Sequence, residues 1–157
     1  MAALISDCGD GATPPEGAEE EGPDEVTAVV TDVVDGDTIE VLLTDGAEED
    51  VRYIGIDTPE SVKPGEPVQC GGMRASHANE RLVAGRRVRL QFDAERRDRY
   101  GRLLAYVYVG ELFVNAELVR RGLARTLTIE PNDSFAPSLR RLESAAGRTG
   151  RGLWGEC

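Results

Sequence analysis

Lysine, histidine and aromatic residues are scarce in this chain, and long apolar runs are missing. Of 157 residues, Lys63 is the one lysine beside 17 arginines, His77 is the one histidine, and aromatic residues make up 5%. No apolar run approaches the roughly 20 residues needed to cross a bilayer, so the sequence predicts no transmembrane helix. It also holds no glycine-rich phosphate loop, Ser-His-Asp set or zinc-ligand spacing. We expect His77 to have a structural or surface role.

Positive charge is also in short supply. Residues 1–25 contain eight Asp or Glu and no Lys or Arg, so they hold -8 of the net charge of -11 and predict an acidic, disordered tail. Residues 26–157 form the predicted single domain, in which 21 acidic residues face 18 basic ones. This balance argues mildly against tight non-specific DNA binding. Arginine clusters within 86–89 and 96–102 could contact nucleic acid, or they could form a solvated rim.

Three cysteines do not suffice for a metal pattern, and one is left over from any pair. Pairing Cys70 with Cys157 would close a loop of 86 intervening residues and stabilise the fold by roughly 4 kcal/mol. That pairing implies an oxidising compartment, whereas two unrelated thiols would suit the cytosol. Cys8 stands at the head of the acidic tail and could carry a lipid anchor, although Asp7 is a poor neighbour for a lipoprotein cleavage site. Residues 1–6 are too short for a targeting core, so a leader is not visible in this chain.

Alternating Val, Thr and Ile predict a β-rich domain after the tail. Asp35-Gly36 and Asp45-Gly46 are dipeptides that favour tight hairpin turns. The expected strands are residues 26–34, 39–43, 51–56, 87–92 and 103–109.

Helical spacing of apolar residues appears in three later segments. We expect a helix over residues 73–84, one from 115 to 122 with Asn115 as its N-cap, and one from about Ser134 to Gly147 with Pro137 in its first turn. Five antiparallel strands, with a helix between the third and fourth and further helices after the fifth, predict an α+β fold that is mainly β. Its expected core is a five-stranded barrel of the oligonucleotide-binding (OB) type with about three helices.

Two aspartates mark the predicted strand ends. Asp37 follows the first turn and Asp57 ends the third strand, so a barrel can bring both carboxylates to one rim. Together they suit a hard cation, Ca²⁺ or Mg²⁺, and the pair alone does not choose between them. A plain hairpin turn is the alternative interpretation of Asp35-Gly36-Asp37-Thr38.

Two arginines and a glutamate complete a set suited to phosphodiester hydrolysis. Arg52 lies in an apolar strand and needs an anion, which a phosphate or an ion pair with Asp57 or Glu60 would supply. Glu60 lies close to Asp57 and could deprotonate a water, or it could be a surface charge of the loop. Arg102 could hold the oxygens of the transition state, or it could be rim charge.

In this order and at this spacing, the motifs resemble the staphylococcal nuclease (thermonuclease) family over residues 26–154. The residues that carry the resemblance are Asp35-Gly36-Asp37-Thr38, Arg52, Asp57-Thr58-Pro59-Glu60, Asp98-Arg99-Tyr100-Gly101-Arg102, Leu104-Ala105-Tyr106-Val107-Tyr108, Val114-Asn115, Leu118-Val119-Arg120, Gly122-Leu123-Ala124, Pro131-Asn132 and Trp154.

The resemblance implies an active site at these motifs. It implies that Asp37, Asp57 and the backbone carbonyl of Thr58 ligate Ca²⁺, and that Glu60 serves the attacking water. By the same resemblance, Arg52 and Arg102 bind the phosphate, and Arg99 and Tyr100 contact the substrate. Such enzymes cut DNA and RNA with little sequence preference and leave 3′-phosphate ends, without a covalent intermediate.

One departure from the family concerns base stacking. Leu127 and Ile129 stand where the best-known family member has two tyrosines. Because aromatic stacking is worth about 1–3 kcal/mol per base, we expect a weaker grip on substrate or a different position for the base.

We therefore predict a monomeric, calcium-dependent, sugar-nonspecific endonuclease that acts on DNA and RNA outside the cytoplasm, secreted or at the cell surface. The main alternative is a catalytically weak or silent nucleic-acid-binding module. A third possibility is a protein-interaction domain with the acidic tail as its tether. Retention of both aspartates, both arginines and the glutamate favours the enzyme.

Overall fold

The fold is built on a strongly twisted antiparallel sheet that closes on itself. The computed structural model describes residues 24–61, 65 and 67–157. Buried and exposed side chains alternate within residues 28–31 and 39–42, as a sheet with one face in the core requires, whereas Leu103–Val109 is buried or half-buried throughout. The barrel strands are β1 (Glu25–Asp35), β2 (Thr38–Leu43), β3 (Glu48–Tyr53), β5 (Arg87–Gln91) and β6 (Leu103–Val109).

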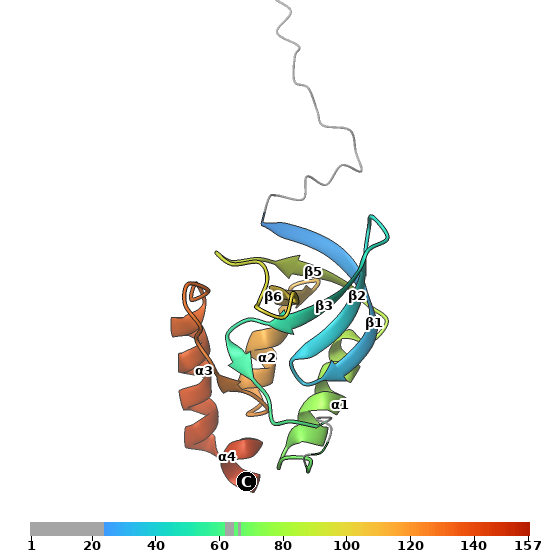
Figure 1. Ribbon diagram of the computed structural model, residues 1–157. Helices are drawn as coiled ribbons and strands as arrows, with labels where there is room; N and C mark the ends of the chain where they lie inside the picture. The colour runs from blue at the N-terminus through green and yellow to red at the C-terminus, as the bar shows by residue number, and fades with distance from the viewer. Residues whose placement is uncertain (1–23, 62–64, 66) are drawn as a thin grey trace, which may run out of the picture.

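Closure comes from a parallel pairing at the seam. The strands follow the order β3-β2-β1-β5-β6, and β3 also pairs with β6 through Val51–Leu103 and Tyr53–Ala105. The short strand β7 (Leu112–Phe113) extends β6 as a hairpin. The predicted five-stranded OB-type barrel is therefore confirmed (Figure 1).

Helices cover one end of the barrel. They are α1 (Gly72–Val83), α2 (Val114–Arg120), α3 (Ala136–Thr149) and α4 (Leu153–Glu156). In Figure 1, α2 lies between α1 and α3, and it contacts both of them. Ala75, Ala78 and Leu118 bring these helices against the barrel side chains in one buried cluster. Within the described residues, no helix has the length and apolar character needed to span a membrane.

The predicted third strand is in fact two strands. β3 ends at Tyr53, and a separate β4 (Ile56–Asp57) pairs with β8 (Arg125–Thr126) outside the barrel. The chain turns at Gly55, whose φ of 82° is unfavourable for other residues. Since the Ile54 N–H donates to the Ala105 carbonyl at 2.9 Å, the break is fixed by a strand distant in sequence. Because of this break, Asp57 lies on β4, outside the barrel.

Helix boundaries also differ from those expected. α3 begins at Ala136 with a proline in its first turn, as predicted, but it continues to Thr149 and ends at Gly150, whose φ is 65°. Gly147 is therefore not its end. β1 begins at Glu25, one residue before the predicted strand. Residues 1–23 lie outside the described part, so the disordered tail remains a prediction.

Asn115 is a buried hydrogen-bonding residue, and its prediction as an N-cap is wrong. The N-cap position of α2 is Phe113, and Asn115 lies within the helix with no exposed surface. Its Oδ1 accepts from the Val107 N–H at 2.9 Å, and its Nδ2 donates to the Ile54 carbonyl at 2.8 Å. One side chain therefore satisfies backbone groups of two segments next to the site.

Asn115→Ala should lower the free energy of unfolding by about 3 kcal/mol, because it leaves a buried N–H and a buried carbonyl without partners. Urea denaturation measures this loss. Ser144→Ala, at an exposed position of α3, is the control and should stay within about 0.5 kcal/mol of the parent. An Asn115→Ala midpoint equal to that of the control would contradict the assigned role.

Candidate active site

The turn between β1 and β2 holds the Asp37 carboxylate in a fixed position. Asp37 is 5% exposed. Its Oδ1 accepts from the Thr38 hydroxyl at 3.0 Å, and its Oδ2 accepts from the Thr58 N–H at 3.0 Å. The Asp37 N–H itself donates to Asp35 Oδ1 at 3.1 Å. These bonds tie the turn to the loop after β4, so two segments 20 residues apart form one structure.

Gly36 is required in this turn because neighbouring atoms leave no space for a side chain, and not because its backbone angle is unusual. It is absent from the glycines with positive φ among the described residues, whereas Gly46 in the second hairpin has a φ of 89°. A Cβ at Gly36 would lie 2.7 Å from Thr58 Oγ1 and 2.8 Å from Ala75 Cβ. The missing side chain lets the turn, the Thr58 loop and α1 pack against each other.

Asn79 of α1 supports the same turn, and this role was not predicted from the sequence. It is fully buried on α1, its Oδ1 accepts from the Tyr53 hydroxyl at 2.6 Å, and its Nδ2 donates to the Asp35 carbonyl at 2.9 Å. A polar residue beside Ala75 and Ala78 on the apolar face of a predicted helix was the available signal. A buried amide at such a position needs partners.

Arg52 joins the two aspartates. Its Nη1 lies 3.3 Å from Asp37 Oδ2 and its Nη2 lies 3.4 Å from Asp57 Oδ1. Nη1 also donates to the carbonyls of Tyr53 and Ile56, both at 3.0 Å. The side chain is only 16% exposed. The guanidinium is therefore held rigidly. Nη1 is occupied by Asp37 and two backbone carbonyls, whereas Nη2 makes one longer contact, with Asp57.

Asp57 and Thr58 occupy different environments. The Asp57 side chain is 58% exposed, whereas Thr58 is 5% exposed. Thr58 Oγ1 is one of three buried side-chain polar atoms that have no hydrogen-bond partner among the described residues. An accessible carboxylate beside an unsatisfied oxygen is the kind of surface at which a cation or ordered water binds.

The carboxylates influence each other electrostatically. Burial, together with the nearby charge of Asp37, raises the pKa of Asp35 to about 7. Partial burial also raises the pKa of Asp57, although the Arg52 guanidinium opposes this shift. In both cases burial is the largest cause of the raised pKa, and the neighbouring Asp37 charge adds to it.

Glu60 is positioned through its backbone. Its N–H donates to Gln69 Oε1 at 3.0 Å, and its carbonyl accepts from the Gln69 N–H at 2.9 Å. Gly72, the first residue of α1, packs so closely on the Glu60 carbonyl that a Cβ there would clash. The Glu60 carboxylate makes no hydrogen bond or ion pair with another residue that the structure describes. Its position is fixed while its carboxylate stays available.

Arg102 and Tyr100 extend from the loop before β6. Arg102 Nε donates to Asp98 Oδ2 at 2.8 Å, and the Asp98 Oδ1 also accepts the N–H groups of Tyr100 and Arg102. Partial burial acts to raise the pKa of Asp98, but the hydrogen bonds from Arg102 lower it overall. Arg99 donates to the Tyr100 hydroxyl at 2.8 Å, and the Tyr100 ring is 69% exposed.

A hollow of about 450 Å³ brings the predicted substrate-binding residues together. Arg52, Arg99, Tyr100 and Arg102 line it, with apolar side chains that include Leu127 and Ile129. Asp57 and Thr58 line a different hollow, of about 260 Å³, with Cys70 and Cys157. Asp37 and Glu60 line neither of these two. The predicted site thus lies around the Arg52 guanidinium, which faces the larger hollow and contacts both aspartates.

The residues present fit a calcium ion. Within the described part of the chain, no three His, Cys, Asp or Glu side chains gather where they could hold a metal. A cation would therefore use the two carboxylates of Asp37 and Asp57, the Thr58 carbonyl and water. Oxygen ligands of this mixed kind suit Ca²⁺. Thr58 Oγ1 has no hydrogen-bond partner among the described residues, which leaves it free to bond a water or another polar group at this site.

Most arginines of the two predicted basic clusters are paired with acids. Arg97 makes two hydrogen bonds to Glu49, at 2.9 and 2.8 Å, and Arg89 lies 3.4 Å from Glu25. Arg96 lies 3.8 Å from Asp24. Their charges are largely neutralised, which favours the rim interpretation for these three.

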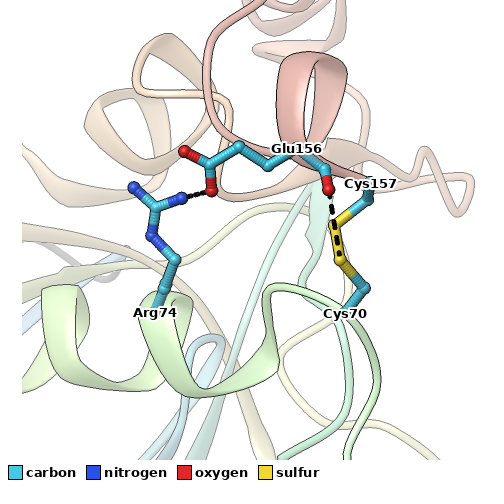
Figure 2. Close-up of a disulfide and its surroundings, with 4 residues drawn as sticks. All are labelled: Cys70, Arg74, Glu156 and Cys157. Atoms are coloured by element: carbon cyan, nitrogen blue, oxygen red, sulfur yellow. Dashed lines mark hydrogen bonds and ion pairs between the residues drawn. A yellow bond between two sulfur atoms is a disulfide. The ribbon is translucent and has the colours of Figure 1, made fainter.

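Cys70 and Cys157 are paired as a disulfide, with Cα atoms 6.0 Å apart. The pair joins the segment before α1 to the residue after α4 (Figure 2). Beside it, Arg74 of α1 forms an ion pair with Glu156 of α4. Since Cys70 and Cys157 line the same hollow as Asp57 and Thr58, this link lies next to the loop after β4. Cys8 is outside the described residues.

Comparison with known proteins agrees with this geometry. The profile of the family described as staphylococcal nuclease homologue matches residues 50–156. The chain is 42% identical over 126 residues to a thermonuclease of Staphylococcus intermedius, covering 80% of this chain and 74% of that protein. It is 40% identical over 130 residues to a thermonuclease of Staphylococcus hyicus, covering 83% and 76%.

A Bacillus protein is similar to the same extent. Endonuclease YncB of Bacillus subtilis is 41% identical over 131 residues, which cover 82% of this chain and 62% of that protein. The profile match spans well over half of the chain and includes the loop after β4 and the C-terminal helices. The chain therefore belongs to the staphylococcal nuclease family.

Proposed function

We propose that this chain is a calcium-dependent, sugar-nonspecific endonuclease that hydrolyses DNA and RNA to leave 3′-phosphate ends. Its class, a nuclease that hydrolyses phosphodiesters, follows from the family. The calcium requirement, the substrates and the product ends are our proposal. The observation that supports it best is Arg52, which contacts both Asp37 and Asp57 while it faces the hollow that Arg102 also lines.

Arg52 and Arg102 would bind the scissile phosphate from two sides. Each guanidinium already has one edge occupied, Arg52 by Asp37 and backbone carbonyls and Arg102 by Asp98, so the remaining N–H groups are pre-oriented. Such fixed donors stabilise the charge that develops on the phosphate oxygens in the transition state. They need little reorganisation when the substrate binds.

Glu60 would accept the proton of the attacking water. The water oxygen attacks phosphorus, the bond from phosphorus to O5′ breaks, and the leaving O5′ takes up a proton from solvent, so that the products are a 3′-phosphate and a 5′-hydroxyl. Asp37, Asp57 and the Thr58 carbonyl would hold Ca²⁺, which when bound supplies positive charge for the phosphate oxygens. Locked by Thr38 and Thr58, Asp37 is the more rigid of the two carboxylate ligands.

The base would lie on an aliphatic surface. Leu127 is 40% exposed and Ile129 is 65% exposed, and both line the hollow beside Tyr100. Tyr100 is the one aromatic ring exposed there among the described lining residues. We infer a weak grip on individual bases, which suits an enzyme with little sequence preference.

The proposed location is outside the cytoplasm. The pairing of Cys70 with Cys157 supports it, because disulfides persist in oxidising compartments. We propose further that the protein acts as a monomer. A lipid anchor at Cys8 remains a prediction, since that residue lies outside the described part of the chain.

The proposal is tested by incubating the folded protein with single-stranded DNA in Ca²⁺, in Mg²⁺ and in a chelator, and by analysing the ends of the fragments. We expect cutting in Ca²⁺ that yields 3′-phosphate ends and that stops in the chelator. Absence of cutting by well-folded protein at several salt concentrations would instead support the silent binding module.

A further inference from the structure

A second basic surface lies on the outer face of α1, away from the residues assigned to catalysis. A hollow of about 400 Å³ is lined by Arg74, His77, Arg81 and Arg121, together with Ala78, Leu123 and Gly152. Positions 74, 77 and 81 share one face of a helix, because their spacing is close to whole turns. No carboxylate is among the lining residues.

The local charge around this hollow is positive, although the chain is acidic. Arg74 pairs with Glu156, and Glu117 is shared by Arg120 and Arg121 at 2.6 and 2.8 Å. Arg81 makes no ion pair with any described residue. Counting Glu80, the exposed neighbour of Arg81 on α1, four arginines lie beside three carboxylates, an excess of one positive charge. Arg81 alone of the lining arginines differs in this respect from Arg89, Arg96 and Arg97, which each have an acidic partner.

The hollow is connected to the proposed site by α1 itself. The helix begins with Gly72 packed on the Glu60 carbonyl, and Arg81 lies nine residues further along. At 1.5 Å per residue that is about 14 Å, or roughly four nucleotides of a stacked strand. A strand that leaves the site beside Glu60 and follows α1 would therefore meet Arg74, His77 and Arg81 in turn.

The outer face of the barrel is unfavourable for a polyanion. On the outer face of the barrel, Asp32 is paired with Glu40 and Glu40 with Asp50, so three exposed carboxylates lie in register across β1, β2 and β3. Glu48 and Glu49 line a further hollow with Glu40 and Asp50, next to Arg102. A phosphate backbone is repelled from this face and attracted toward α1.

The geometry points to the hollow lined by Arg74, His77, Arg81 and Arg121 as a second binding site, which holds the phosphate backbone of a nucleic-acid strand beyond the catalytic residues. This inference rests on the proposed nuclease function. Its charged side chains are exposed, whereas Ala78 and Leu123 are buried at its base, and the lining comes from α1, the segment after α2 and the residue before α4. The hollow therefore presents exposed positive charge to a passing backbone. Such a site would let an acidic chain with Leu127 and Ile129 in place of stacking tyrosines hold a long substrate.

The test uses Arg81→Gln in a Glu60→Gln background, so that the nucleic acid stays intact. Arg87→Gln is the matched control, since Arg87 is exposed and lines none of the hollows described. Fluorescence anisotropy gives the affinity for labelled oligothymidylates of about four and about sixteen nucleotides, the range of lengths that OB folds bind. Each titration is repeated at several salt concentrations.

For the longer oligonucleotide we expect Arg81→Gln to weaken binding about five-fold, the upper end for one exposed ion pair. The slope of log affinity against log salt should fall by about one unit. The shorter oligonucleotide and the Arg87→Gln control should bind as the parent does. Unchanged affinity for the longer oligonucleotide would overturn the inference, and so would an equal loss in both variants or for both lengths.

Titration of inorganic phosphate, followed by NMR shifts of α1 amides, separates a free anion from a strand. If Arg81→Gln removes phosphate binding but leaves the affinity for the longer oligonucleotide unchanged, the hollow takes a small anion and the nucleic-acid site is overturned. Failure of the proposed function is recognised separately, as absence of calcium-dependent cutting by a protein with Arg81 intact.

Discussion

Glu60→Gln should lower kcat on single-stranded DNA by about 10²- to 10⁴-fold, the loss expected when a general base is removed. The amide has the shape of the carboxylate but cannot accept the proton of the attacking water. Because both backbone groups of Glu60 bond to Gln69, the substituted side chain should keep its position. Initial rates at saturating Ca²⁺ measure the loss, and thermal unfolding should show an unchanged Tm.

Glu111→Gln is the control for this variant. Glu111 is an exposed glutamate in the hairpin between β6 and β7, so its substitution removes the same charge far from the site. Calcium titrations of both variants separate loss of proton transfer from loss of metal affinity. If Glu60→Gln retains the parent kcat, Glu60 is not the base and the water must be activated in another way.

The barrel could be predicted from the sequence because its signals are local. β6 covers Leu103–Val109, which coincides with the expected strand, and β2 differs by one residue. β2 alternates between buried and exposed positions, and that alternation is visible in its order of residue types, whereas β6 is an unbroken run of apolar residues that is buried or half-buried throughout. A turn dipeptide such as Asp45-Gly46 also acts within a few residues, so the hairpin after β2 required no knowledge of distant contacts.

The errors occur where a distant partner decides the conformation. The third strand ends early because Ile54 bonds to Ala105 of β6 and because the chain turns at Gly55. Asn115 was predicted as an N-cap from local preference, but its amide bonds to Ile54 and Val107 instead. In both cases at least one partner is more than 50 residues away, and hydrogen bonding in the core outweighs local preference.

The candidate site was predicted to a similar extent. Asp37 and Asp57 were expected at one rim of the barrel; both contact Arg52, although Asp57 lies on β4 outside the barrel, and the roles assigned to them stay predictions. Asn79, which holds the Asp35 carbonyl, was not identified, because a single amide on a helix does not reveal its partner. The basic hollow on α1 was missed for a related reason: Arg121 joins Arg74 and Arg81 only through tertiary packing.

Replacing Cys70 and Cys157 by serine should lower the free energy of unfolding by about 4 kcal/mol. The disulfide links residues 87 positions apart, and its loss gives the unfolded chain that loop's conformational freedom. Urea denaturation of the double variant measures the effect, with Cys8→Ser present throughout so that no third thiol can exchange. The m-value should rise, because an unfolded chain without the link exposes more surface.

The Cys8→Ser parent with its disulfide reduced is the matched control, since it removes the link without changing a side chain of the pair. Reduced parent and double variant should have the same midpoint. A midpoint unchanged from the oxidised parent would mean that the link adds nothing to global stability. The non-covalent attachments of α4, through the Leu153 N–H to the Gly122 carbonyl at 2.9 Å and through Arg74 to Glu156, would then hold the C-terminal segment alone.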